Sequence, residues 1–261
     1  MPMPNFVFIM TDTQGADVVG CYRDPELGAR LGTPNLDRLA AQGVRFDRAY
    51  TTCPLCTPAR AGIFTGLTPS VAGSVTNNLA CGANIRNMAH YFGKAGYRTV
   101  YTGKWHLDGL DYFDSGVCPM EWDDTYWFDG RRYLASLTEE QIRLWRQGLK
   151  TPGDIRAHGI GPEFTWARHC SDRAIEFLRS SGDRPFVLCV SYDEPHHPSL
   201  CPAEYIERFA DFDFPVGPAA RDDLRAKPAL QREWAGSRRQ QPTSGFWRAP
   251  RYFGCNSFVD A

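Results

Sequence analysis

The sequence predicts an α/β protein in which helices flank a mostly parallel sheet. Short apolar runs that read as buried strands alternate along the chain with segments that carry apolar residues at helical spacing. The three clearest apolar runs are each followed at once by polar residues, after Met10, after Thr102 and after Tyr192. Because ligands of open parallel sheets bind outside the carboxyl ends of the strands, we expect these polar groups to form one site.

The individual elements are assigned in chain order from the apolar pattern and from residues that start or stop helices. Pro34 suits the first turn of a helix and Gly43 suits its end, which places one helix between them. Strands are expected at residues 5–10, 44–50, 97–102 and 186–192. Helices are expected at residues 34–42, 57–65, 85–94 and 163–181.

Two of these helices carry an apolar face that is expected to point into the core. In the helix at residues 34–42 this face consists of Leu36, Leu39 and Ala40. In the helix at residues 163–181 it consists of Trp166, Cys170, Ala174, Phe177 and Leu178. Residues 108–162, here called the insertion, are irregular and rich in aromatic and acidic residues, and we expect them to pack over a sheet edge as a pocket wall.

The composition is that of an ordinary globular protein of one large or two small domains. Of the 261 residues, 43% are apolar and 23% are charged, and the formal net charge is −1. Because there is no basic tract, nucleic acid is not expected as a partner, and no apolar run reaches the roughly 18 residues of a membrane span. The absence of a secretory leader pattern and the odd number of cysteines predict a cytoplasmic, reducing location.

The segment Cys56-Thr57-Pro58-Ala59-Arg60 is expected to form an anion site at the start of a helix. Pro58 suits the first helical turn, and the Thr57 hydroxyl can cap the free amides. Cys56 would then lie just ahead of the helix, where unpaired N–H groups and the helix dipole favour an anion. Arg60, on the first turn, can donate a charge-assisted hydrogen bond to the same anion.

The same cysteine allows two other interpretations. Cys53-Pro54-Leu55-Cys56 is a Cys-x-x-Cys segment at a helix start, as in thioredoxin-like redox sites, and predicts a reversible disulfide between its two thiols. A plain structural loop is the second alternative. The further polar groups that follow the strands favour an anion site over both.

The Cys-x-Pro-x-Arg core, followed by Thr65-Gly66, resembles the signature of the type I sulfatases, which are formylglycine-dependent enzymes of the alkaline phosphatase-like superfamily. Gly103-Lys104-Trp105-His106-Leu107 is similar to the second motif of that family, and His196-His197-Pro198 to a third. The resemblance implies an alkaline phosphatase-like α/β fold. It also implies that a formylglycine-generating or equivalent enzyme oxidises Cys56 to formylglycine, whose hydrated aldehyde is the nucleophile.

Residue roles follow from this resemblance. It implies that Asp12 and residue 56 bind a divalent cation, with calcium as the expected metal. It implies that Arg60 and Lys104 hold the sulfate group, that His106 contacts the nucleophile or the lysine region, and that His196 protonates the leaving oxygen, with His197 as the alternative. Asn78 and His197 are the expected substrate-binding residues.

The implied activity is hydrolysis of a sulfate monoester, with a small molecule or a carbohydrate as the alcohol. Hydrolysis of a phosphonate monoester or phosphodiester by the same superfamily chemistry is the first alternative, and an inactive fragment is the second. Sulfatases carry a later strand whose Asp-His or Asp-Asn pair completes the metal site, and no such strand is expected here. We therefore expect residues 1–261 to be the N-terminal portion of a sulfatase catalytic domain, incomplete at its C-terminus.

Overall fold

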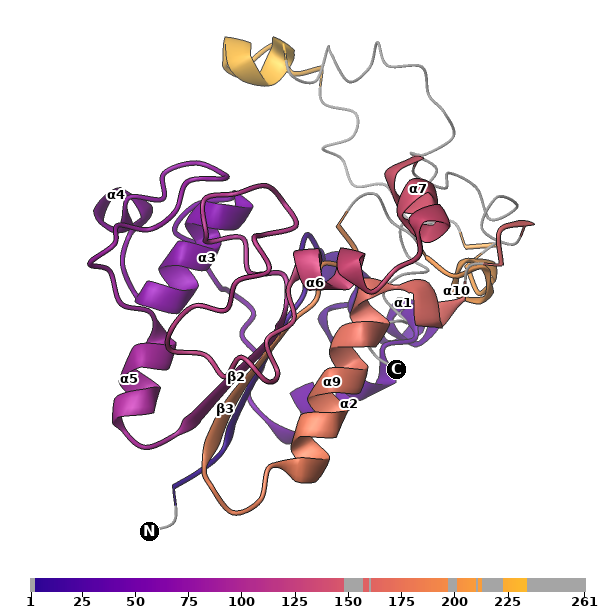
Figure 1. Ribbon diagram of the computed structural model, residues 1–261. Helices are drawn as coiled ribbons and strands as arrows, with labels where there is room; N and C mark the ends of the chain where they lie inside the picture. Colours follow the sequence, from indigo (N-terminus) through magenta and orange to yellow (C-terminus); the bar gives the residue numbers. More distant parts are fainter. Residues whose placement is uncertain are drawn as a thin grey trace.

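A parallel sheet forms the centre of the computed structural model, which describes residues 3–147, 157–159, 161–196, 201–209, 211–212 and 223–233. Its three strands are β1 (Phe6–Met10), β2 (Arg98–Gly103) and β3 (Phe186–Ser191), in the order β1-β3-β2 (Figure 1). Ser191, the last residue of β3, is in register with Met10 of β1 and with Gly103 of β2. The three strands therefore end at the same level, and the predicted α/β class with a parallel sheet is confirmed.

Helices cover both faces of this sheet. Helices α3 and α5 lie on one face and α9 lies on the other (Figure 1). Among the described residues, the labelled helices are α1 (Pro25–Leu31), α2 (Pro34–Gln42), α3 (Cys56–Thr65), α4 (Pro69–Ala72), α5 (Met88–Lys94), α6 (Gly130–Ala135), α7 (Glu139–Gln147), α9 (Trp166–Ser180) and α10 (Ala203–Glu207). Single turns of 3-10 helix occur at Ala16–Val18, Gly20–Tyr22 and Pro162–Phe164.

The central strand β3 is buried along its whole length, which explains its continuous apolar sequence. Successive side chains of a strand point to opposite faces, so β3 contributes to two separate cores. Phe186, Leu188 and Val190 pack with α9, and Val187 and Cys189 pack with α3 and α5. Burial of each large apolar side chain contributes about 1.5–3 kcal/mol, so these two cores hold the strand ends in place.

Helix α9 confirms the predicted helix at residues 163–181, with a slightly later start. The Thr165 side chain accepts a hydrogen bond from the Arg168 amide and caps the helix. Four of the five predicted core residues are buried, but Leu178 is 45% exposed, and its prediction as a core residue was wrong.

Three further predictions differ from the structure. Residues 44–50 form no strand, and the large apolar side chains there, Val44, Phe46 and Tyr50, are exposed because this segment pairs with no other strand. Helix α2 begins at Pro34 and ends before Gly43 as predicted, yet none of its residues is buried. Helix α5 starts at Met88 rather than at residue 85, because the Asn87 side chain caps it.

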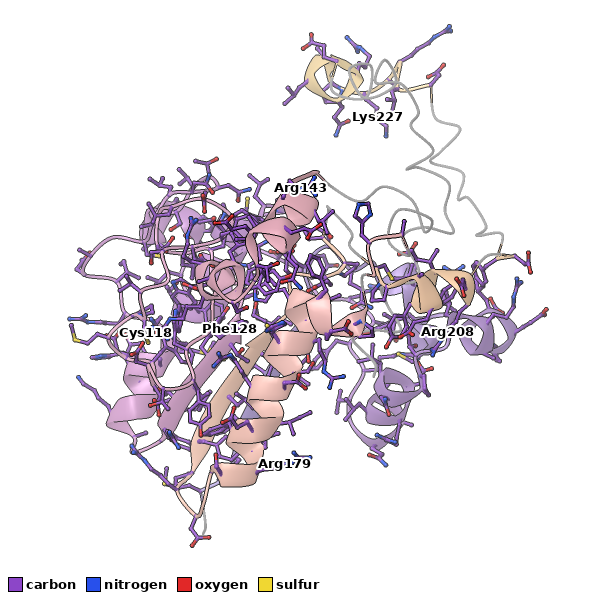
Figure 2. All side chains as sticks on the ribbon, turned by 45° about the vertical axis from the view of Figure 1, so that its right-hand side comes forward. Cys118, Phe128, Arg143, Arg179, Arg208 and Lys227 are labelled. Atoms are coloured by element: carbon purple, nitrogen blue, oxygen red, sulfur yellow. The ribbon has the colours of Figure 1, made fainter. Side chains whose placement is uncertain are left out.

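The insertion packs beside the sheet and is partly regular. Phe128, labelled in Figure 2, forms a parallel bridge with Thr102 of β2. The insertion also contains α6 and α7, two helices that the apolar pattern did not predict. Within the described ranges, no helix combines the length and the apolar character needed to cross a lipid bilayer.

Candidate active site

Polar side chains that follow the three strands meet at the carboxyl edge of the sheet. Asp12 follows β1, Lys104 follows β2 and Asp193 follows β3. The Lys104 ammonium nitrogen is 2.7 Å from Asp12 Oδ2 and 3.0 Å from Asp193 Oδ1. Lys104 is fully buried and both carboxylates are nearly so. A buried ammonium requires such partners, so these three residues form one charge cluster.

Arg60 connects α3 to this cluster. Its Nη1 donates to the Lys104 carbonyl oxygen at 2.6 Å and to Ser191 Oγ at 2.8 Å. Its Nη2 donates to Asp12 Oδ2 at 3.3 Å. Burial raises the pKa of Asp12, but the charges of Lys104 and Arg60 outweigh that effect and hold the pKa below its ordinary value. Asp12 is therefore a carboxylate at neutral pH.

Cys56 is the first residue of α3 and lies beside Asp12, with its Sγ 3.8 Å from Asp12 Oδ1. The helix start differs from the prediction in one detail. Thr57 lies inside the helix and does not cap it: its amide donates to Asn77 Oδ1 at 3.0 Å, and its hydroxyl accepts the Asn78 amide at 3.3 Å. Burial raises the pKa of the Cys56 thiol, and Lys104 opposes this only in part. The raised pKa disfavours the thiolate, which is the nucleophilic form of cysteine, and this argues against a redox role.

His106 lies two residues after Lys104 and is held in the neutral state. Its Nε2 is 2.8 Å from Asn78 Oδ1, and Nδ1 is buried without a hydrogen-bond partner among the described residues. Burial, together with the charges of Lys104 and Arg60, lowers the pKa of His106 to about 4. Asn78, predicted to bind substrate, is therefore joined to His106 through its amide oxygen.

Asp114 supports His106 and was missed by the sequence interpretation. Its fully buried carboxylate accepts the Trp105 amide at 3.0 Å and also the His106 amide. These bonds fix a loop in which His106 has a φ of 56°, a left-handed conformation that is uncommon outside glycine. Asp114 belongs to the insertion, and no spacing in the sequence links it to the Lys104 motif.

Asp12, Cys56 and His196 could together hold a metal ion. One potential ligand atom from each lies within 4.8 Å of the others. Arg60 and Lys104 contact Oδ2 of Asp12, whereas Oδ1 is on the Cys56 side. A carboxylate, an imidazole and the side chain of residue 56 fit a divalent cation. Calcium, which prefers roughly six to eight oxygen ligands, would need donors beyond this trio.

The structure thus brings Asp12, Cys56, Arg60, Lys104 and His196 into one cluster, with His106 adjacent. His197 lies outside the described residues. The roles given to these side chains in catalysis and binding stay predictions. Asp193 was not among the predicted site residues, although its position directly after an apolar strand is the signal that selected Asp12.

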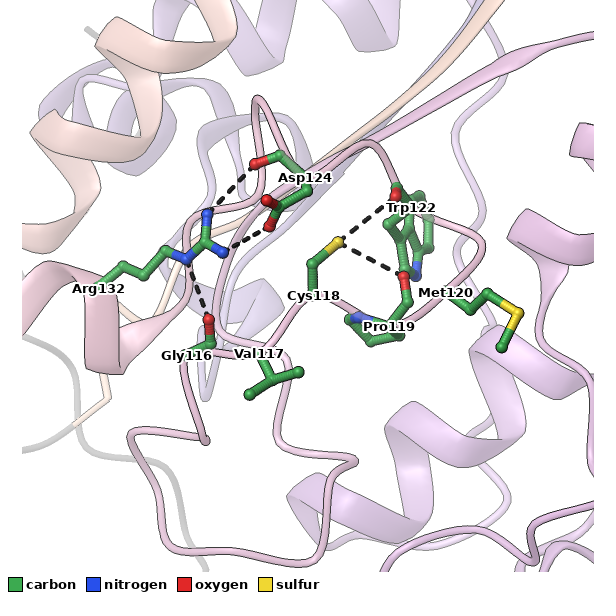
Figure 3. Close-up of a pocket in the computed structure, with 8 residues that line it drawn as sticks. All are labelled: Gly116, Val117, Cys118, Pro119, Met120, Trp122, Asp124 and Arg132. Atoms are coloured by element: carbon green, nitrogen blue, oxygen red, sulfur yellow. Dashed lines mark hydrogen bonds and ion pairs between the residues drawn. The ribbon is translucent and has the colours of Figure 1, made fainter.

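A separate hollow lies within the insertion and shares no residue with this cluster. Its volume is about 440 Å³ (Figure 3). The lining residues are Gly116, Val117, Cys118, Pro119, Met120, Trp122, Asp124 and Arg132. Arg132 is bonded there to the Gly116 carbonyl at 3.0 Å and to the Asp124 carboxylate, so its charge is already paired.

Comparison with known proteins points to one family. The family described as Sulfatase matches residues 4–260. A protein of Escherichia coli named as the uncharacterized sulfatase YidJ is 53% identical over 264 residues, covering 100% of this chain and 52% of the relative. An N-acetylglucosamine-6-O-sulfatase of Bacteroides thetaiotaomicron is 28% identical over 239 residues, covering 88% of this chain and 37% of the relative.

The fold is also found among solved structures. The phosphonate monoester hydrolase of Agrobacterium radiobacter superposes with a TM-score of 0.70 at 21% identity, covering 99% of this chain and 57% of that one. At this identity the likeness shows a shared fold and no more. The chain spans about half the length of the YidJ relative and less of the Bacteroides enzyme.

Proposed function

The chain belongs to the sulfatase family, and on that premise we propose that it hydrolyses sulfate monoesters at the cluster around Cys56. One observation carries the proposal. Asp12, Cys56 and His196 converge within 4.8 Å, and the buried cations Arg60 and Lys104 both contact Asp12. Positive charge at a helix start and a set of metal-ligand atoms are what a sulfate ester requires of a site.

Residue 56 is proposed to act as formylglycine, produced from the cysteine by a formylglycine-generating or equivalent enzyme. When present, the hydrated aldehyde supplies one hydroxyl that attacks sulfur and a second that permits release of sulfate. The raised pKa of the thiol supports this role, because an unmodified Cys56 would be a weak nucleophile at neutral pH.

A divalent cation, proposed to be calcium, would be held by Asp12, residue 56 and His196. When bound, it supplies Lewis acidity toward a sulfate oxygen. The carboxylate state of Asp12, maintained by Lys104 and Arg60, prepares this site for a cation. Calcium prefers about six to eight oxygen ligands, so it requires donors in addition to these three side chains.

The remaining side chains are proposed to bind the sulfate group and to protonate the leaving oxygen. Lys104 and Arg60 provide fixed positive charge beside Asp12 and residue 56. His196 is proposed to protonate the departing alcohol oxygen, a role that suits an imidazole. His106 stays neutral and is hydrogen-bonded to Asn78, the predicted substrate-binding residue. His106 is therefore proposed to position Asn78 rather than to protonate the leaving oxygen.

The alcohol half of the substrate is proposed to be a carbohydrate or a small molecule. The Bacteroides relative is named as acting on N-acetylglucosamine 6-O-sulfate, which makes a sulfated sugar the first choice for an assay. Four aromatic residues of the insertion, Trp122, Trp127, Phe128 and Tyr133, are buried in the core and therefore offer a sugar ring no surface on which to stack.

The test combines mass spectrometry with parallel assays. The 261-residue chain is co-expressed with a formylglycine-generating enzyme, and the peptide that contains residue 56 is expected to lose about 18 Da relative to cysteine. The modified protein should then hydrolyse aryl or sugar sulfates, and Cys56→Ser, which lacks the second hydroxyl, should not turn over. Faster hydrolysis of a phosphonate monoester would assign the alternative activity. Fully modified protein that cleaves neither ester would refute the proposal and indicate an inactive fragment.

A further inference from the structure

One tyrosine of the insertion reaches three residues of the candidate active site. Tyr112 donates its hydroxyl to Asp193 Oδ2, and its ring lies 4.2 Å from the Lys104 ammonium. The ring centroid is also 5.1 Å from that of His196. The two residues that share the hydroxyl bond are 81 positions apart in the sequence, so only the fold brings them together.

The Asp193 carboxylate is divided between two partners. Oδ2 accepts the Tyr112 hydroxyl, whereas Oδ1 is 3.0 Å from the Lys104 ammonium. Lys104 in turn is 2.7 Å from Asp12 Oδ2. Two carboxylates therefore share one buried ammonium, and the orientation of one of them is set by the tyrosine.

The charges of the cluster explain why this orientation matters. Lys104 and Arg60 carry two positive charges, and Asp12 and Asp193 carry two negative charges. Without the hydroxyl bond, both oxygens of Asp193 become available to Lys104, because a carboxylate and an ammonium attract strongly in a buried site. The ammonium would then be drawn away from Asp12 and from a bound anion.

We propose that Tyr112 and Asp193 are a pair of positioning residues that hold the Lys104 ammonium beside Asp12 for sulfate binding. This inference rests on the proposed function, since it assigns the two residues to the same site. The hydroxyl fixes Asp193, Asp193 fixes the ammonium, and the ring of Tyr112 shields that ammonium from solvent through a cation–π contact.

The test compares Tyr112→Phe, Asp193→Asn and the double variant of the 261-residue chain with the parent protein. Tyr112→Phe keeps the ring and removes the hydroxyl, so the dissociation constant of inorganic sulfate should rise about tenfold and kcat/KM should fall about tenfold. Because the hydroxyl acts through Asp193, the double variant should lose no more than Asp193→Asn alone. Residues in direct contact also couple in stability, so the coupling that counts is the one measured in the sulfate dissociation constant and in kcat/KM.

Tyr133→Phe is the matched control. Tyr133 is fully buried and donates its hydroxyl to the carbonyl of Phe164, a residue outside the charge cluster, at 2.6 Å. This control should lower the free energy of unfolding but leave the sulfate dissociation constant and kcat/KM unchanged.

The inference is overturned if Tyr112→Phe behaves like Tyr133→Phe, or if the losses of the two site variants multiply in the double variant. Sulfate binding separates this inference from the proposed function. A parent protein that binds sulfate without turnover contradicts the proposed hydrolysis. The sulfate dissociation constants of the parent and its variants still test the roles of Tyr112 and Asp193. A parent protein that hydrolyses sulfate esters without measurable binding of free sulfate supports the proposed hydrolysis, and the kcat/KM values of the variants then test the pair.

Discussion

Protonation of His106 should make the stability of this protein depend on pH in a predictable direction. The Nε2 of His106 is 2.8 Å from the Asn78 amide oxygen, so the neutral ring carries its proton there. A second proton would have to enter at Nδ1, which is buried and near the charges of Lys104 and Arg60. These features lower the pKa of His106 from 6.5 to about 4.

The sign of the effect follows from proton binding in the two states. Below about pH 6.5 the unfolded chain binds a proton at His106 that the folded protein does not bind until about pH 4. The free energy of unfolding should therefore fall as the pH decreases through this interval. Between about pH 7.5 and about pH 5, this one side chain should reduce it by about 2 kcal/mol. His106 is only 4% exposed, so solvent screening reduces this value little.

His106→Gln isolates the contribution. Glutamine can donate an amide hydrogen to Asn78 but does not ionise, so the variant should lack this pH dependence. Urea unfolding of both proteins at the two pH values gives the difference in unfolding free energy. The stability of the parent relative to the variant should decrease by about 2 kcal/mol toward the acidic pH. A difference that is the same at both pH values would refute the argument that burial and the two cations keep His106 neutral.

Three further predictions concern the same edge of the sheet. Arg60→Ala should lower the free energy of unfolding by about 3–5 kcal/mol, because Asp12 loses a buried partner; urea unfolding that shows a loss below about 1 kcal/mol would contradict this. Gly103→Ala should reduce the thermal midpoint sharply or prevent folding, because a Cβ would lie 1.9 Å from the Ser191 carbonyl oxygen at a φ of 109°, and a midpoint equal to that of the parent would count against this contact. Calcium should raise the thermal midpoint of formylglycine-containing protein and a chelator should reverse the rise, with Asp12→Asn insensitive to both; an equal response of that variant would exclude Asp12 as a ligand.

The predicted and observed folds agree where an apolar segment is long and buried. Residues 186–190 are apolar throughout because β3 is covered on both faces, so the sequence pattern was sufficient to identify the strand. Residues 44–50 instead intersperse apolar with charged residues, and there Tyr50 is 91% exposed and no strand forms. Alternating apolar residues indicate a preference for an extended backbone. A β-strand also needs a second strand to pair with, and the tertiary fold determines whether one is present.

The same distinction applies to the candidate site. Asp12, Cys56, Arg60 and Lys104 could be identified from the sequence alone, because each lies in a short motif or directly after an apolar strand. Only the tertiary structure decided that Asp193, Tyr112 and Asp114 support them. Their contacts join segments far apart in the chain, and such contacts depend on how strands and insertion pack rather than on local sequence.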